Sequence, residues 1–205
     1  MNQTLGTPAV LVDRFWAPPT ERSRAALRSV ALVVGFALVT AALAQIEIKL
    51  SFTPVPITGQ TLGVLLAGGT LGSRLGATSQ LLYWGFGLVG LPFYAGGEGG
   101  WKNGTGATMG YLVGFVVAAA VIGYLAEHRQ DRNVASSWSA MALGSIIIYA
   151  FGAGWLAHKL NVPVATGDTN ALSLGVTPFL IGDLIKLLLA GALLPAVWAT
   201  VDRTK

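Results

Sequence analysis

The sequence predicts an all-α, polytopic membrane protein, and three features of its composition indicate this class. Of 205 residues, 53% are hydrophobic and only 11% are charged, whereas soluble domains average about 25% charged residues. Short polar or Gly/Pro-containing segments separate six apolar stretches, as in a protein that crosses the bilayer several times. Glycine is abundant, at 27 residues, which suits helices that pack closely in lipid.

The first half of the chain supplies three of the expected transmembrane helices. Residues 1–24 are polar and contain prolines, so we expect a mobile cytoplasmic tail there. The first apolar stretch, 27–46, follows a basic segment. The second, 57–71, is short, so it spans only if the bilayer or neighbouring helices accommodate the mismatch. The third, 75–93, ends at a glycine-rich loop.

The second half supplies the remaining three helices, at 108–126, 138–158 and 178–200. The polar segment at 161–177 contains proline, glycine and asparagine, which predicts an external loop. Because 205 residues fit one bundle rather than two domains, residues 25–205 are expected to form a single six-helix substrate-binding domain.

The distribution of basic residues predicts that both termini are cytoplasmic and that the chain is a multi-pass protein of the cell membrane. With this orientation the inner segments carry nine lysines and arginines and the outer segments four. The inner residues are Arg14, Arg22, Arg24, Arg28, Arg74, Arg129, Arg132, Arg203 and Lys205, and the outer ones are Lys49, Lys102, Lys159 and Lys186.

The N-terminal region has an alternative interpretation as a cleaved signal sequence. Residues 22–44 have a basic start and an apolar middle, and Ala42-Leu43-Ala44 resembles a signal-peptidase site. However, about twenty residues precede the basic start, and cleavage would leave an odd number of spans. We therefore favour an uncleaved first helix.

The sequence gives no sign of catalytic or metal chemistry. It has no cysteine, and the glycine-rich segment at 96–106 lacks the Gly-Lys-Ser/Thr end of a phosphate-binding loop. His128 and His158 are far apart and outside any ligand cluster. The basic residues lie between apolar spans rather than on one surface, which argues against nucleic acid as a partner. We expect no enzymatic activity, no metal and no cofactor.

Polar and aromatic residues gather on the predicted outer side and indicate a ligand pocket. The strongest candidates are Asp183 and Lys186, because they lie on one helix face inside an apolar run, where each charge is costly. The other candidate substrate-binding residues are Gln60, Tyr94, Trp101, Asn103 and Tyr111. For Tyr94 and Trp101 an aromatic belt at the membrane surface remains an alternative, and for Gln60 a bridge between helices.

Four sequence blocks resemble the BioY family, the biotin-specific S component of energy-coupling factor (ECF) transporters. They are TPVPITGQTLGVLLAG at 53–68, GLPFYAGGEGG at 90–100, GYLVGF at 110–115 and TPFLIGDLIK at 177–186. The resemblance covers nearly all of residues 25–200. It implies a six-helix protein that binds biotin from the outer side and delivers it with an energising module. That module consists of one transmembrane coupling protein and two ATPases, which alone use ATP.

Under this resemblance, the Asp183/Lys186 pair would meet the polar ends of biotin. A cation can hold the carboxylate and an acid can accept from the ureido N–H groups, but the sequence does not fix which residue meets which end. Ala37 and Ala41 form a small-residue face that either docks the coupling protein, as the resemblance implies, or packs inside the bundle. A solitary facilitator, or an S component for another small organic acid or vitamin, is the alternative function.

Overall fold

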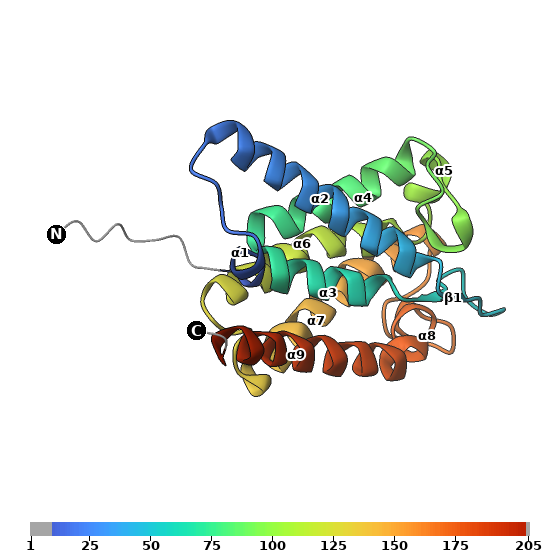
Figure 1. Cartoon of the computed structure of the whole chain (residues 1–205). Coiled ribbons are helices and arrows are strands. Elements are labelled where there is room, and N and C mark those ends of the chain that lie inside the picture. The colour runs from blue at the N-terminus through green and yellow to red at the C-terminus, as the bar shows by residue number, and fades with distance from the viewer. Residues whose placement is uncertain (1–9, 204–205) are drawn as a thin grey trace.

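The structure is a computed structural model that describes residues 10–203, and it is built mainly of helices. Figure 1 shows α2 and α4 on one side, α7 and α9 on the other, and α3 and α6 between them. The helices are α1 (Leu11–Phe15), α2 (Arg22–Ala44), α3 (Gln60–Leu71), α4 (Ser73–Leu88), α5 (Trp101–Gly104), α6 (Met109–Glu127), α7 (Val134–Leu160), α8 (Ala171–Gly175) and α9 (Leu180–Arg203), with 3₁₀ turns η1 (Ala95–Gly97) and η2 (Thr177–Phe179) and strands β1 (Glu47–Ile48) and β2 (Ile57–Thr58).

Each apolar stretch expected from the sequence contains a helix, although some boundaries differ. α4 ends at Leu88 rather than near residue 93, because the chain turns at Gly90, where φ is 103°. α7 is longer than expected at both ends. The side chain of Asn133 caps its first turn by accepting from the Ala135 N–H, and Asn161 ends it in the left-handed conformation.

Four segments of the described chain are long and apolar enough to cross a membrane. They are Arg22–Ala44, Met109–Glu127, Val134–Leu160 and Ala171–Val201. α3 and α4, with 12 and 16 residues, are shorter than the usual span of about 20 residues. The structure therefore supports a multi-pass membrane protein with four long apolar segments and two shorter helices, α3 and α4.

Part of the expected mobile tail is folded, which corrects the prediction for residues 10–15. Val10, Leu11 and Val12 are buried at the end of the bundle opposite β1 and α5 (Figure 1). The carboxylate of Asp13 accepts from the buried guanidinium of Arg28 at 2.7 Å, which ties α1 to α2. Sequence polarity missed this segment because its burial depends on helices far along the chain. Residues 1–9 lie outside the described residues.

Close glycine contacts bring the central helices together. A Cβ atom on Gly123 of α6 would lie 2.2 Å from the carbonyl carbon of Gly72, and one on Gly68 of α3 would lie 2.8 Å from the carbonyl oxygen of Ala119. Real Cβ atoms do not approach so closely, so both positions require glycine. This packing agrees with the close helix contacts that the glycine content indicates.

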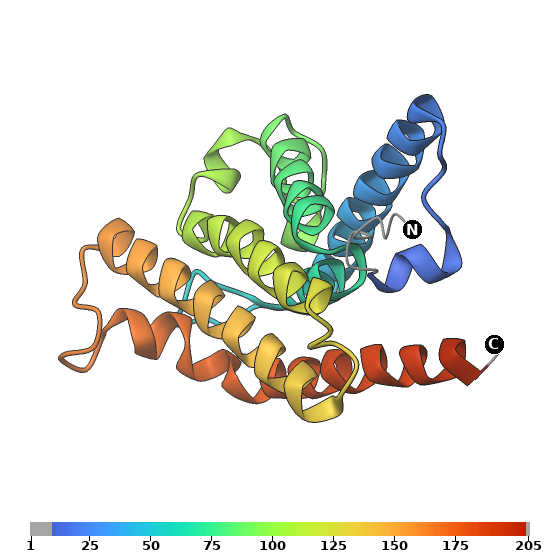
Figure 2. The ribbon, with the colours of Figure 1, turned by 90° about the vertical axis from the view of Figure 1, so that its left-hand side faces the viewer.

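The small-residue face of α2 points into the bundle in the structure of the chain by itself. Ala37 is fully buried and Ala41 is 7% exposed, and both belong to the main hydrophobic core. α2 packs there against α3 and α4. The small side chains allow this internal contact, which is the alternative interpretation of the pattern. In Figure 2 the start of α2 stands away from the other helices, and its later part runs against the bundle.

A short two-stranded sheet was not expected from the all-α pattern. β1 and β2 pair antiparallel, with Glu47 opposite Thr58, and they bring together the two ends of the loop between α2 and α3. The hydroxyl of Thr53 in this loop donates to the carbonyl oxygen of Leu174 in α8 at 2.7 Å. These contacts fold the loop over the end of the bundle.

Candidate binding site

A cavity of about 570 Å³ lies at the end of the bundle that carries β1 and α5. Small-molecule sites typically have volumes of roughly 300–1,000 Å³. Its walls come from the α2–α3 loop, the segment before α6, and helices α3, α6, α7 and α9. The apolar part of the wall includes Val55, Leu112, Phe115, Ile148 and Phe179. The cavity is thus large enough for a small organic molecule.

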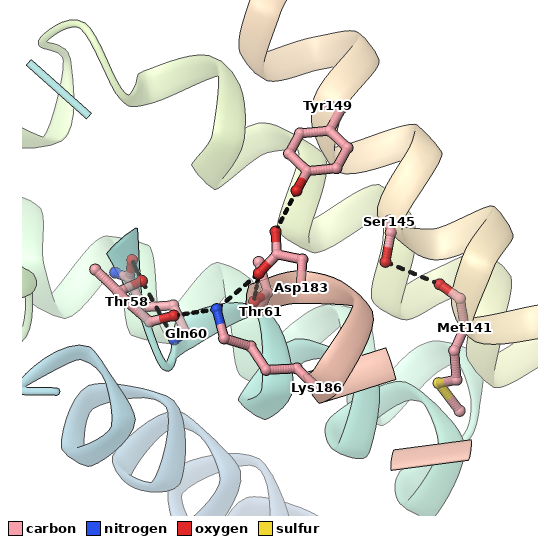
Figure 3. A network of polar contacts seen from close by, with 8 residues as sticks. All are labelled: Thr58, Gln60, Thr61, Met141, Ser145, Tyr149, Asp183 and Lys186. Carbon is pink, nitrogen blue, oxygen red and sulfur yellow. Dashed lines mark hydrogen bonds and ion pairs between the residues drawn. The ribbon is translucent and has the colours of Figure 1, made fainter. Parts of the chain in front are cut away.

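The carboxylate of Asp183 is the centre of a hydrogen-bonded cluster on the cavity wall, shown in Figure 3. Oδ1 accepts from the hydroxyl of Thr61 at 2.9 Å and from the ammonium of Lys186 at 2.7 Å. Oδ2 accepts from the hydroxyl of Tyr149. Donors from α3, α7 and α9 therefore converge on one carboxylate, which offsets the cost of placing it in an apolar helix.

The ammonium of Lys186 joins this cluster to the α2–α3 loop. Besides Asp183, it donates to the backbone carbonyl oxygen of Thr58 at 2.5 Å (Figure 3). The side chains of Lys186 and Asp183 are 16% and 12% exposed, so the two charges compensate each other away from bulk water. An ammonium carries three protons, and these two contacts use two of them. The pair therefore offers one further donor beside a carboxylate that can still accept.

The amide of Gln60 lines the cavity and is itself held in place. Its oxygen accepts from the hydroxyl of Thr58 at 2.7 Å, and its nitrogen donates to the hydroxyl of Tyr83. Tyr83 is a fully buried residue of α4. Gln60 therefore bridges α3 and α4, as the alternative interpretation expects, and its side chain also lines the cavity.

Tyr94 and Tyr111 line the cavity, and their hydroxyls donate hydrogen bonds to backbone carbonyl oxygens of other segments. The hydroxyl of Tyr94 donates to the carbonyl oxygen of Trp84 at 2.8 Å, and that of Tyr111 donates to the carbonyl oxygen of Gly175 at 2.7 Å. Burial raises the pKa of Tyr94 to about 12, so this hydroxyl stays protonated at neutral pH. Both residues therefore offer an aromatic surface rather than a charged group.

Asn103 lines the cavity, whereas Trp101 does not. The Asn103 amide nitrogen donates to the carbonyl oxygen of Gly99 at 2.9 Å, which uses one of its two N–H groups. Trp101, at the start of the same short helix, is 72% exposed and lies outside the cavity lining. Trp101 therefore lies apart from the other predicted substrate-binding residues, all of which line the cavity. Its exposure fits the alternative, an aromatic residue at the membrane surface.

Sequence reasoning missed four residues that complete the site. Phe115 and Phe179 supply aromatic wall, and Thr61 and Tyr149 donate to Asp183. A tyrosine inside the apolar run of α7 was a usable signal, because a buried hydroxyl needs a hydrogen-bond partner. The phenylalanines gave none, since an apolar residue in an apolar helix is equally suited to lipid.

Charged residues of both signs lie at the mouth of the cavity. Lys49, Glu98 and Lys102 line the cavity and are exposed to solvent. Glu47 lies further in, with its side chain 17% exposed, and one of its oxygens pairs with the Lys49 ammonium at 3.2 Å. The mouth therefore carries two acids and two bases above a largely apolar interior.

Together the fold and the cavity describe a helical membrane protein with a cavity at one end of the bundle that is large enough for a small organic molecule. Among residues 10–201, whose side chains the structure describes, no three or more His, Cys, Asp or Glu form a cluster suited to a metal ion. The polar groups of the cavity are arranged for hydrogen bonding to a ligand with both donors and acceptors. Paired charges inside membrane segments are typical of the substrate sites of membrane transporters.

Comparison with known proteins identifies the family. The BioY family model matches residues 18–203, and the chain belongs to this family. It is 39% identical over 178 residues to the biotin transporter BioY of Rhizobium etli, covering 83% of this chain and 92% of that protein. It is 38% identical over 174 residues to the biotin transporter BioY of Rhodobacter capsulatus, covering 80% and 90%.

A solved structure shows the same fold. The crystal structure of the S component for biotin from an ECF-type ABC transporter superposes with a TM-score of 0.77 at 25% identity, covering 88% of this chain and 95% of that one. The predicted family is therefore confirmed, and the protein is a membrane transporter component rather than an enzyme.

Proposed function

We propose that this chain is the biotin-binding S component of an ECF transporter. The observation that carries the proposal is the buried Asp183/Lys186 pair, whose remaining donor and acceptor face a cavity with aromatic walls. Biotin combines an apolar bicyclic body with a ureido group that has both N–H donors and a C=O acceptor. The names of the R. etli and R. capsulatus relatives and of the solved S component support the same ligand.

We propose that the ureido group of biotin lies against this pair. Asp183 and Lys186 already compensate each other, so a neutral group with adjacent donor and acceptor fits better there than a carboxylate. The ureido oxygen would accept the third proton of Lys186, and a ureido N–H would donate to Asp183. The apolar body would then pack on Tyr94, Tyr111 and Phe115, with the carboxylate toward the mouth.

The proposed topology has six spans in the cell membrane, including the short helices α3 and α4, with both termini in the cytoplasm. Nine of thirteen basic residues then lie on the inner side, and the cavity opens outward. A single cysteine placed at Ser23 should resist an impermeant thiol reagent added to intact cells. Ready labelling from outside would overturn the orientation.

We further propose that transport requires an ECF module of one coupling protein and two ATPases, and that the chain needs no metal or cofactor of its own. This extends what the solved S component of an ECF-type transporter suggests.

Two measurements test the proposed function. Radiolabelled biotin should bind the purified full-length chain in detergent with saturation, and lack of binding to folded protein would refute the ligand. Uptake of biotin by cells should depend on coexpression of the module and on intact ATP hydrolysis. Uptake at full rate without the module would instead favour a solitary facilitator.

A further inference from the structure

The mouth of the cavity contains an acid that biotin itself does not satisfy. Glu47 Oε1 pairs with Lys49, but Oε2 is buried and has no hydrogen-bond partner among the residues that the structure describes. A buried acceptor without a donor is destabilising, because it has lost its hydrogen bonds to water without gaining a partner. Free biotin presents a carboxylate at this end in the proposed orientation, and a carboxylate has no proton to donate. The geometry therefore leaves room for a ligand with a donor here.

The charges around Glu47 indicate what that ligand would carry. Glu47 and Glu98 can hold an ammonium, and Lys49 and Lys102 can hold a carboxylate, and all four line the same cavity. A mouth with both signs of charge is complementary to a zwitterion. The cavity of about 570 Å³ also extends to these exposed residues, so a molecule longer than biotin is not confined to the inner part.

We propose that the site also binds biotin joined through its carboxyl group to the side-chain amine of lysine. The amide link is neutral, so the negative charge of free biotin moves to the far end of the lysine chain, where a positive charge accompanies it. The α-ammonium of the lysine would donate to Glu47, and its α-carboxylate would pair with Lys102. This inference rests on the proposed function, because it places the ureido end at Asp183 and Lys186 as for free biotin. The added ligand class is biotinylated amino acids and the short peptides that contain them.

Competition against radiolabelled biotin on the purified full-length chain tests the proposal. Three unlabelled competitors are compared: biotin, Nε-biotinyl-lysine, and biotinyl-6-aminohexanoic acid, which keeps the carboxylate but lacks the α-ammonium. Nε-biotinyl-lysine should bind within tenfold of biotin and at least fivefold more tightly than the aminohexanoic acid conjugate. Binding more than tenfold weaker than biotin, or no preference for the ammonium, would overturn the proposal.

Matched variants assign the preference to one residue. Glu47→Gln should abolish the difference between the two conjugates. Glu21→Gln, at the exposed residue that precedes α2, should preserve it. A difference that survives Glu47→Gln would refute the role of Glu47. If labelled biotin does not bind folded protein, both the proposed function and this inference fail. If biotin binds but Nε-biotinyl-lysine does not compete, only the inference fails.

Discussion

Replacing Asp183 by asparagine should destabilise the bundle and weaken ligand binding. The change keeps the shape of the side chain but leaves the Lys186 ammonium, 16% exposed, without its carboxylate. Removing one partner of a buried ion pair costs about 3–5 kcal/mol. We expect the lower end, about 3 kcal/mol, because the cavity opens to water at its mouth. For a protein of this size, that corresponds to a fall in Tm of roughly 6–12 °C.

The double variant Asp183→Asn/Lys186→Met separates the charge balance from the other contacts of the cluster. Because it removes both charges, no uncompensated ammonium remains, and it should recover at least half of the loss in Tm. Labelled biotin should bind each variant at least tenfold more weakly, which is about 1.4 kcal/mol. Stability is followed by thermal unfolding of the detergent-purified protein, and affinity by equilibrium binding.

The control for this series is Asp168→Asn, which changes an exposed carboxylate in the 161–170 loop. It should leave both Tm and affinity unchanged. Equal effects of Asp183→Asn and Asp168→Asn would refute the argument that the cluster is a buried, compensated pair. A double variant no more stable than Asp183→Asn would show that the charges do not compensate each other.

Three further substitutions test other parts of the structure. Tyr149→Phe removes one of the donors to Asp183 and should weaken biotin binding about three- to tenfold, by equilibrium binding. Asp13→Asn leaves the buried Arg28 without its carboxylate and should lower Tm by at least about 6 °C. Ala37→Leu overpacks the core beside α3 and α4 and should destabilise the protein by about 1–3 kcal/mol in thermal unfolding.

Each of these substitutions has a matched control at an exposed position. Tyr124→Phe, Glu21→Gln and Ala31→Leu change similar side chains outside the cavity and core, and all three should behave as the unmodified protein. Tyr149→Phe with unchanged affinity would remove this residue from the site. If Ala37→Leu and Ala31→Leu are equally stable, the burial of this face of α2 is contradicted. If Asp13→Asn leaves Tm unchanged, the ion pair with Arg28 does not hold α1 to α2.

The charged pair could be predicted because its geometry is local. Asp183 and Lys186 are three residues apart in an apolar run, so the helix alone brings them to one face, and the structure confirms the ion pair. The six apolar stretches are also local signals, and each contains a helix. Asn103, Tyr94 and Tyr111 followed from the clustering of polar and aromatic residues at one end of the predicted bundle.

The remaining features depend on contacts between distant segments. Tyr149 donates a hydrogen bond to Asp183, which lies 34 residues later in the sequence. Nothing in the sequence near Tyr149 indicates that partner. The pattern at Ala37 and Ala41 shows that a neighbour lies close, but it does not say whether that neighbour is inside the chain or in a partner. Whether the side chain of Trp101 faces the cavity or the solvent depends on how residues 89–108 fold, and the sequence does not determine that fold.

The central claim is that the Asp183/Lys186 pair binds the ureido group of biotin. The most direct test compares the affinity of the purified chain for biotin, for its uncharged primary amide, and for an analogue methylated on both ureido nitrogens. The account predicts that the amide binds within threefold of biotin, because the carboxylate lies away from the pair. The methylated analogue should bind at least tenfold more weakly, since it cannot donate to Asp183. An amide that loses tenfold while the methylated analogue binds as biotin does would contradict the claim and place the carboxylate at Lys186.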